Sequence, residues 1–259
     1  MISVRRFATL GCTLLALGVV LLVWQLLTAA TGWISPNTFP APLEVVNALR
    51  QIGGEGYANA ALYEHVLRSV LLVTMGFVVA STIGVALGLA MGASRTVEAL
   101  ANPVFLLLRP IPPLAWIPLA IVWLGLGDAA KIMVIFFAAF VPSVINSFTG
   151  VRQIERPIFE ASAMLGVSGV RYWREVLIPG ALPSIFTGLR LSLQAAWTTL
   201  VAAELVGAVA GLGQILNQAS QDIYPAMIVV GMASVAVCGW LMTLGLGWIE
   251  TRVMPWKPR

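Results

Sequence analysis

The stretch EASAMLGVSGVRYWREVLIPGALP, from Glu160 to Pro183, is the most charged interruption in a largely apolar sequence. It is approached from Arg152 and carries two arginines, two glutamates and two prolines among several small residues. The small side chains at 161–163 allow a helix to approach a partner closely, and Gly166 permits the backbone to turn where a side chain would obstruct it. On its charges alone, the stretch is a loop between two membrane helices.

The composition around this loop is that of an integral membrane protein. Of 259 residues, 59% are hydrophobic and 10% are charged, with a mean hydropathy of +0.92, whereas soluble domains contain about 25% charged residues. Several charge-free runs reach the roughly 20 residues that a spanning helix needs. We therefore predict an all-α polytopic protein with about six transmembrane helices. The expected spans are residues 7–30, 66–91, 109–125, 132–150, 184–209 and 225–249.

The basic residues predict the orientation of the spans. The net charge of +4 is not gathered into a patch of the kind that binds nucleic acid. Ten basic residues fall in segments expected inside and three in segments expected outside, which favours cytoplasmic termini and a cytoplasmic 152–183 loop. The inner set is Arg5, Arg6, Arg95, Arg152, Arg156, Arg171, Arg174, Arg252, Lys257 and Arg259, and the outer set is Arg50, Arg68 and Lys131.

Two parts of the chain differ in composition. Residues 1–65 are expected to hold an uncleaved first helix and an external segment with a short amphipathic helix near 43–52, and residues 66–259 form the core. Cys12 and Cys238 lie in apolar runs and His65 is the single histidine, so neither a disulfide framework nor a metal site is expected.

The second expected span carries a stripe of small residues at a strict spacing of four: Gly76, Ala80, Gly84 and Gly88. Such a stripe lets another helix backbone come close inside a membrane. It packs either within its own subunit, which we favour, or at a subunit interface.

A proline-rich third span and several polar residues are candidates for a solute pathway. Prolines interrupt helices, and broken backbone at membrane depth faces protein or water; the alternative is a kink that only packs on a neighbouring helix. Ionisable groups within spans are functional candidates, unless Arg190 only snorkels to the headgroups and Glu204 only reaches the outer surface. The pathway candidates are Arg109, Pro112, Pro113, Trp116, Asn146, Arg190, Gln194, Thr198 and Glu204.

The loop that opens this section also has a distinctive spacing. Glu-Ala-Ser at 160–162 is followed after three residues by Gly166, and after nine more by Val-Leu-Ile-Pro at 176–179. This resembles the EAA loop of ABC importer permeases: E-A-A, three residues, G, nine residues, I-x-L-P. The resemblance implies a short cytoplasmic helix pair that docks into an ATPase subunit. The residues that it assigns to coupling are Glu160, Ala161, Ser162, Gly166 and Pro179.

The resemblance covers about residues 66–249 and implies a type I ABC importer permease fold. The stretches RPIPPLAWIPL, VLIPGALP and WTTLVAAEL are similar to taurine, alkanesulfonate and nitrate permeases. This implies a cell inner membrane subunit that imports a small anion, either taurine or another alkanesulfonate, or alternatively nitrate or another small solute. The implied partners are a second permease copy, two cytoplasmic subunits that bind ATP and Mg, an external substrate-binding protein and membrane lipid, with no nucleic acid and no cofactor in this chain.

Other classes of protein fit less well. The sequence has no G-x-x-x-x-G-K-[ST] motif for phosphate binding, so we expect no ATPase activity in this chain. An ion-coupled secondary transporter would often show inverted repeats and intramembrane acidic residues, for which Glu204 is the one candidate. A membrane enzyme would be expected to cluster His, Asp or Glu inside its spans, and no such cluster is present.

Overall fold

The computed structural model describes residues 16–256 except for 17, 21, 31–37 and 208–209. Regular secondary structure in this part is helical, as predicted, apart from one isolated bridge between Tyr57 and Ala60. Of the expected first span, residues 7–15, 17 and 21 lie outside the described residues; the described ones are helical and end in a π-helical turn, Leu26–Ala30. The main helices are α2 (Pro42–Gly54), α3 (Leu62–Ala93), α4 (Arg95–Leu108), α5 (Ile117–Leu124), α6 (Asp128–Arg152), α7 (Arg156–Met164), α8 (Gly169–Tyr172), α9 (Ile178–Gly207), α10 (Leu212–Gln221) and α11 (Pro225–Val253).

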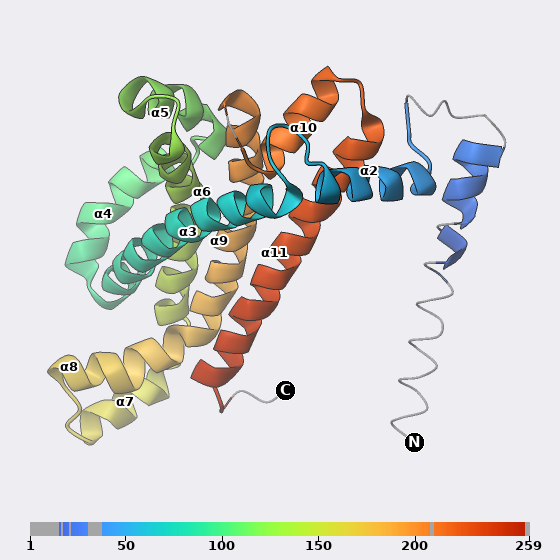
Figure 1. The fold of residues 1–259 in the computed structure, drawn as a ribbon. Helices are drawn as coiled ribbons and strands as arrows, with labels where there is room; N and C mark the ends of the chain where they lie inside the picture. The colour runs from blue at the N-terminus through green and yellow to red at the C-terminus, as the bar shows by residue number, and fades with distance from the viewer. Residues whose placement is uncertain (1–15, 17, 21, 31–37, 208–209, 257–259) are drawn as a thin grey trace, which may run out of the picture.

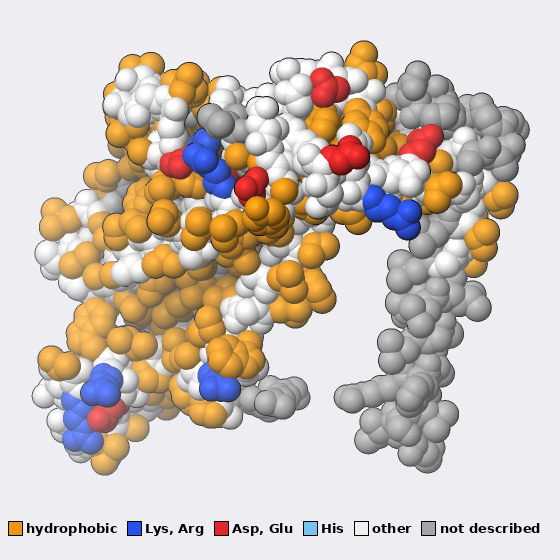
Figure 2. Space-filling model, viewed as in Figure 1, with side chains coloured by type: hydrophobic (Ala, Val, Ile, Leu, Met, Phe, Trp, Pro, Cys, Tyr) orange, Lys and Arg blue, Asp and Glu red, His pale blue; other side chains and the backbone are white. Residues whose placement is uncertain are grey.

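The long helices α3, α6, α9 and α11 occupy the middle of the molecule (Figure 1). Helices α2, α5 and α10 lie at one end, here called the α10 end, and α7 and α8 lie at the opposite end, here called the α7 end. On the face drawn in Figure 2, charged side chains gather near these two ends and the surface between them is largely hydrophobic. This distribution is the one that a membrane-spanning bundle requires.

Four helices of the described chain are long and apolar enough to span a membrane, and a bent pair gives a fifth if its two helices are counted as one span. The pair consists of α4 and the segment Pro113–Leu124, which meet at 84°. Arg95 lies between the expected spans 66–91 and 109–125, where the sequence suggests a loop. In the structure it begins α4, because the hydroxyl of Ser94 accepts a hydrogen bond from the Val97 amide and caps the helix.

The small-residue stripe of α3 packs against α6 of the same chain. A Cβ at Gly76 would lie 2.5 Å from the Ile135 side chain, and one at Gly88 would lie 2.5 Å from the Val144 carbonyl oxygen. A Cβ at Gly84 would also collide with α6, 2.8 Å from Ser143. The interpretation of the stripe as an intrasubunit contact is therefore confirmed.

The fifth span starts earlier than expected. Helical structure is continuous from Gly169 to Gly207, through a π-helical turn at Trp173–Leu177. Pro179 has no amide hydrogen to donate, and the wider turn just before it lets the chain remain helical without that donor. The expected loop therefore ends in a helix that runs directly into the bundle.

Candidate functional site

The α7 end presents the predicted helix pair. Helix α7 ends in a Schellman motif: the Gly166 amide donates to the Ala163 carbonyl and the Val167 amide to the Ser162 carbonyl, both at 3.0 Å. Gly166 has a φ of +68°, a left-handed conformation that glycine adopts without strain. The turn that the sequence predicts at Gly166 is thus confirmed.

Apolar side chains project from the tip of this helix pair. Met164 is 89% exposed, Leu165 78% and Val170 83%. Glu160 and Ala161 are also exposed. A cluster of exposed apolar groups of this kind is a candidate surface for contact with another protein.

Two of the predicted coupling residues do not belong to this exposed tip. The Ser162 side chain is buried and donates to the Phe159 carbonyl at 2.8 Å. Pro179 is half-buried inside α9. The Ser162 hydroxyl is thus bonded within its own helix and is not presented to a partner.

A first groove brings together three pathway candidates. It has a volume of about 450 Å³ and lies between α9 and α11. Arg190, Gln194 and Thr198 of α9 line it beside Trp197, opposite Gly239 and Thr243 of α11. The guanidinium of Arg190 pairs with the carboxylate of Glu250, so Arg190 has a protein partner and does not simply snorkel.

A second groove of about 240 Å³ collects three others, Arg109, Pro113 and Trp116, against α6. The Trp116 ring stacks on Phe137 with 4.1 Å between ring centroids. The broken span therefore both lines a groove and packs on a neighbouring helix. That this groove belongs to a solute pathway stays a prediction.

Pro112 and Asn146 line neither groove. Pro112 is exposed. The Asn146 amide donates to the Pro142 carbonyl at 2.9 Å, and a Cβ at Gly188 would lie 2.5 Å from the Asn146 Cβ. Asn146 is thus packed between α6 and α9, away from both grooves.

Glu204 requires a correction, because the structure places it neither in a groove nor at the surface. Its exposed fraction is 0%. One carboxylate oxygen accepts from the Ser69 hydroxyl at 2.8 Å and the other from the Gly213 amide at 2.7 Å. A buried carboxylate with these partners fastens elements together.

Two residues on α3 that the sequence reading overlooked complete this contact. The Ser69 Oγ accepts from the Leu212 amide at 2.8 Å, and the His65 Nδ1 accepts from the Gly211 amide at 2.9 Å. Three successive amides at the start of α10 are thus capped by side chains of α3 and α9, an arrangement we call the α10 clamp (His65, Ser69 and Glu204). The signal available in the sequence was the spacing of four between His65 and Ser69, with Gly-Leu-Gly at 211–213.

Outside the α10 clamp, a further contact joins the segment between α2 and α3 to the end of α10. The Tyr57 hydroxyl donates to an Asp222 carboxylate oxygen at 2.5 Å. The pKa of Tyr57 is raised above its usual range, mainly by burial and to a smaller extent by this hydrogen bond. The phenol therefore stays protonated at neutral pH and holds the chain before α3 against the end of α10.

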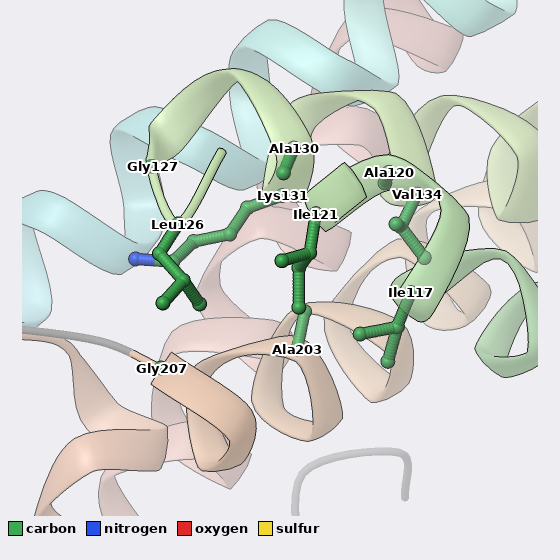
Figure 3. A pocket seen from close by; sticks show the side chains of 10 residues that line it. All are labelled: Ile117, Ala120, Ile121, Leu126, Gly127, Ala130, Lys131, Val134, Ala203 and Gly207. Carbon is green, nitrogen blue, oxygen red and sulfur yellow. The ribbon is translucent and has the colours of Figure 1, made fainter. Parts of the chain in front are cut away.

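A small cavity lies between α5, α6 and α9 (Figure 3). Its volume of about 20 Å³ is room for roughly one water molecule. Lys131 lines it, although the sequence places this lysine in an external turn. The structure corrects this: Lys131 is buried in the first turns of α6. Its Nζ lies 3.5 Å from a carboxylate oxygen of Asp128, which supplies the charged partner that a buried ammonium needs.

These elements define the membrane subunit of a transporter: apolar spans, two mainly apolar grooves that each contain a few polar side chains, and an exposed helix pair at one end. The chain belongs to the family described as binding-protein-dependent transport system inner membrane component, whose model matches residues 80–257. Such a subunit is not itself catalytic; it works in the membrane with ATPase and substrate-binding partners.

Three relatives have names that state the solute that each carries. The chain is 38% identical to the taurine transport system permease protein TauC of Escherichia coli K12, over 93% of this chain and 87% of that one. It is 32% identical to the nitrate import permease protein NrtB of Synechocystis, over 93% and 88%. It is 31% identical to the putative aliphatic sulfonates transport permease protein SsuC of Bacillus subtilis, over 94% and 87%.

A solved structure supports the fold. An inward-facing form of the MetNI methionine ABC transporter matches with a TM-score of 0.59 at 22% identity, over 76% of this chain and 96% of that one. The type I importer permease fold is thus confirmed. At this identity the likeness concerns the fold alone.

Proposed function

We propose that this chain is the permease of an ABC importer that carries a small sulfonate, taurine or another alkanesulfonate, into the cell. It acts as a homodimer in the inner membrane, with both termini in the cytoplasm. The observation that carries the proposal is the exposed apolar tip at Met164, Leu165 and Val170, which a cytoplasmic ATPase subunit covers. That partner binds ATP and Mg, and an external protein delivers the solute at the α10 end.

The sulfonate assignment rests on the similarity to the taurine permease, and nitrate is the second candidate because of the similarity to a nitrate permease. Uptake of radiolabelled taurine, measured with the chain, its ATPase and its binding protein in proteoliposomes, tests the first. Unlabelled ethanesulfonate should compete with it and nitrate should not. Nitrate uptake without sulfonate uptake would reverse the assignment.

Gly166→Val should uncouple transport from ATP hydrolysis. Nothing lies within 4 Å of a Cβ at this position, so valine has space, but its backbone is strained at a φ of +68°, by about 1–2 kcal/mol. The tip then changes shape while the spans stay folded. Uptake and stimulation of the ATPase by loaded binding protein should fall together, and copurification of the ATPase shows whether docking or coupling fails.

Asparagine at the same position is the matched control, because it tolerates the left-handed region far better than a β-branched residue. Gly166→Asn should retain most of the uptake. If a well-expressed Gly166→Val protein transports normally, the helix pair is only a connector between spans.

The proposed orientation predicts opposite labelling of the two ends. In a background without Cys12 and Cys238, single cysteines at Ser168 and Ser220, both exposed, should react with membrane-impermeant thiol reagents from opposite sides. The cysteine at 168 should be reached only in inside-out vesicles, since basic residues concentrate on the cytoplasmic side. Reaction of both cysteines from the same side would contradict the topology.

A further inference from the structure

One wall of the groove between α9 and α11 carries polar side chains that contacts within the described chain satisfy only in part. Arg190, Gln194, Trp197 and Thr198 follow the helical spacing i, i+4, i+7 and i+8, so they share one face of α9. Gln194 and Thr198 are exposed. Polar side chains on a membrane span face protein or water-filled space rather than lipid tails, so this wall suits a polar occupant, while the rest of the lining is mainly apolar.

The polar wall of the groove offers two hydrogen-bond donors for which no bond within the described residues is seen, on Trp197 and Gln194. The Trp197 indole N–H is buried and has no partner within the described residues, which is costly for a donor of this kind. Gln194 adds an exposed amide. The Thr198 hydroxyl donates to the Gln194 carbonyl at 3.0 Å and keeps its lone pairs. This wall therefore lacks hydrogen-bond acceptors, and a small ligand with acceptor atoms would supply them.

Arg190 supplies the positive charge of the groove, and its guanidinium is already paired with the carboxylate of Glu250. Its side chain is 46% exposed, whereas that of its partner Glu250 is 7% exposed. Glu250 lies in the last turn of α11, so the ion pair joins the α7 end of α11 to α9. An anion entering the groove competes with Glu250 for the same guanidinium.

We propose that this groove binds a small oxyanion, a sulfonate or nitrate, through the Trp197 indole N–H, the Gln194 amide and Arg190. Binding draws Arg190 away from Glu250 and releases the end of α11 from α9. The ion pair is thus a latch that the transported anion opens. This inference rests on the proposed function and adds to it a solute site and the residues that sense its occupancy.

Direct binding to the purified complex of the permease with its ATPase subunits, in lipid nanodiscs, tests the site. The probe is radiolabelled ethanesulfonate, a simple anion without an ammonium group. Trp197→Phe keeps a ring but loses the N–H, and should weaken binding about tenfold, the value of one hydrogen bond to a charged group. Trp248→Phe is the matched control: Trp248 lies outside the groove against Arg252, and its loss should leave the dissociation constant unchanged.

The latch is tested by the two members of the ion pair. Arg190→Gln should weaken binding tenfold or more, because it removes the charge that holds the anion. Glu250→Gln should tighten binding by about threefold or more, because the competitor for Arg190 is gone. A purely structural pair would make both variants change binding in the same direction.

Each outcome decides the proposal. Opposite shifts in the pair variants with a weaker Trp197→Phe support it, and displacement of the probe by nitrate or by taurine shows which oxyanion the site prefers. Unchanged binding in Trp197→Phe, or parallel shifts in the pair variants, overturns it. If the full system still imports sulfonate in that case, the proposed function stands and only this site is wrong.

Discussion

Gly88→Val is expected to prevent the bundle from assembling. A Cβ at Gly88 would lie 2.5 Å from the Val144 carbonyl oxygen and 2.7 Å from the Ser147 Cβ. The backbone of α6 has to move for valine to fit, and neighbouring close contacts at Gly84 and Gly92 resist that movement. We expect a loss of about 3 kcal/mol or more in the free energy of unfolding, and with it most of the folded protein.

The matched control is Gly245→Val on α11, where nothing lies within 4 Å of the added Cβ. Both substitutions add the same side chain to a spanning helix, so the comparison isolates the contact between α3 and α6. Yield of monodisperse protein and thermal unfolding in detergent are the measurements. Equal melting temperatures for the two variants would show that the helices separate easily.

Glu204→Ala should release α10 from the bundle. Alanine leaves the Ser69 hydroxyl and the Gly213 amide without their buried acceptor and leaves a cavity. Unsatisfied buried donors cost about 1–3 kcal/mol each, so we expect a destabilisation of about 3 kcal/mol. Solute uptake should fall as well, because α10 lies at the end where the binding protein is proposed to dock.

Hydrogen exchange at the amides of 211–213 measures the release directly, and these amides should lose their protection in Glu204→Ala. Glu55→Ala is the control, because Glu55 is exposed at the same end of the molecule and its loss should change neither exchange nor melting. Retained protection in Glu204→Ala would mean that His65 and Ser69 hold α10 without the carboxylate.

Much of the architecture was predictable because it depends on local properties of the chain. Apolar runs near 20 residues predict spans, and the structure shows helices at 62–93, 128–152 and 225–253. Gly166 was predicted to make a turn, and its positive φ confirms this. The stripe on α3 predicted a close helix contact, although the sequence alone favoured its own subunit only slightly.

Local properties of the sequence were misleading at the starts of α4 and α9, where other groups or a change in helix type satisfy the backbone donors and acceptors. The charges of 160–183 suggested a loop before 184, but the π-helical turn at Trp173–Leu177 lets α9 continue through Pro179 and Pro183. Arg95 suggested a loop by its charge, whereas the Ser94 cap starts a helix there. In both places the deciding factor was how backbone donors and acceptors were satisfied, which charge and hydropathy do not report.

By itself, the sequence determined the class of fold, the apolar character of the spans and the turn at Gly166. The tertiary structure alone decided what each polar side chain does. Glu204 and Arg190 are both ionisable groups on α9, yet Glu204 is buried in the α10 clamp and Arg190 lines a groove. The reason is physical: Ser69 and Glu204 are separated by 135 residues. Whether a polar group is satisfied or left open to a ligand depends on which distant helix packs against it.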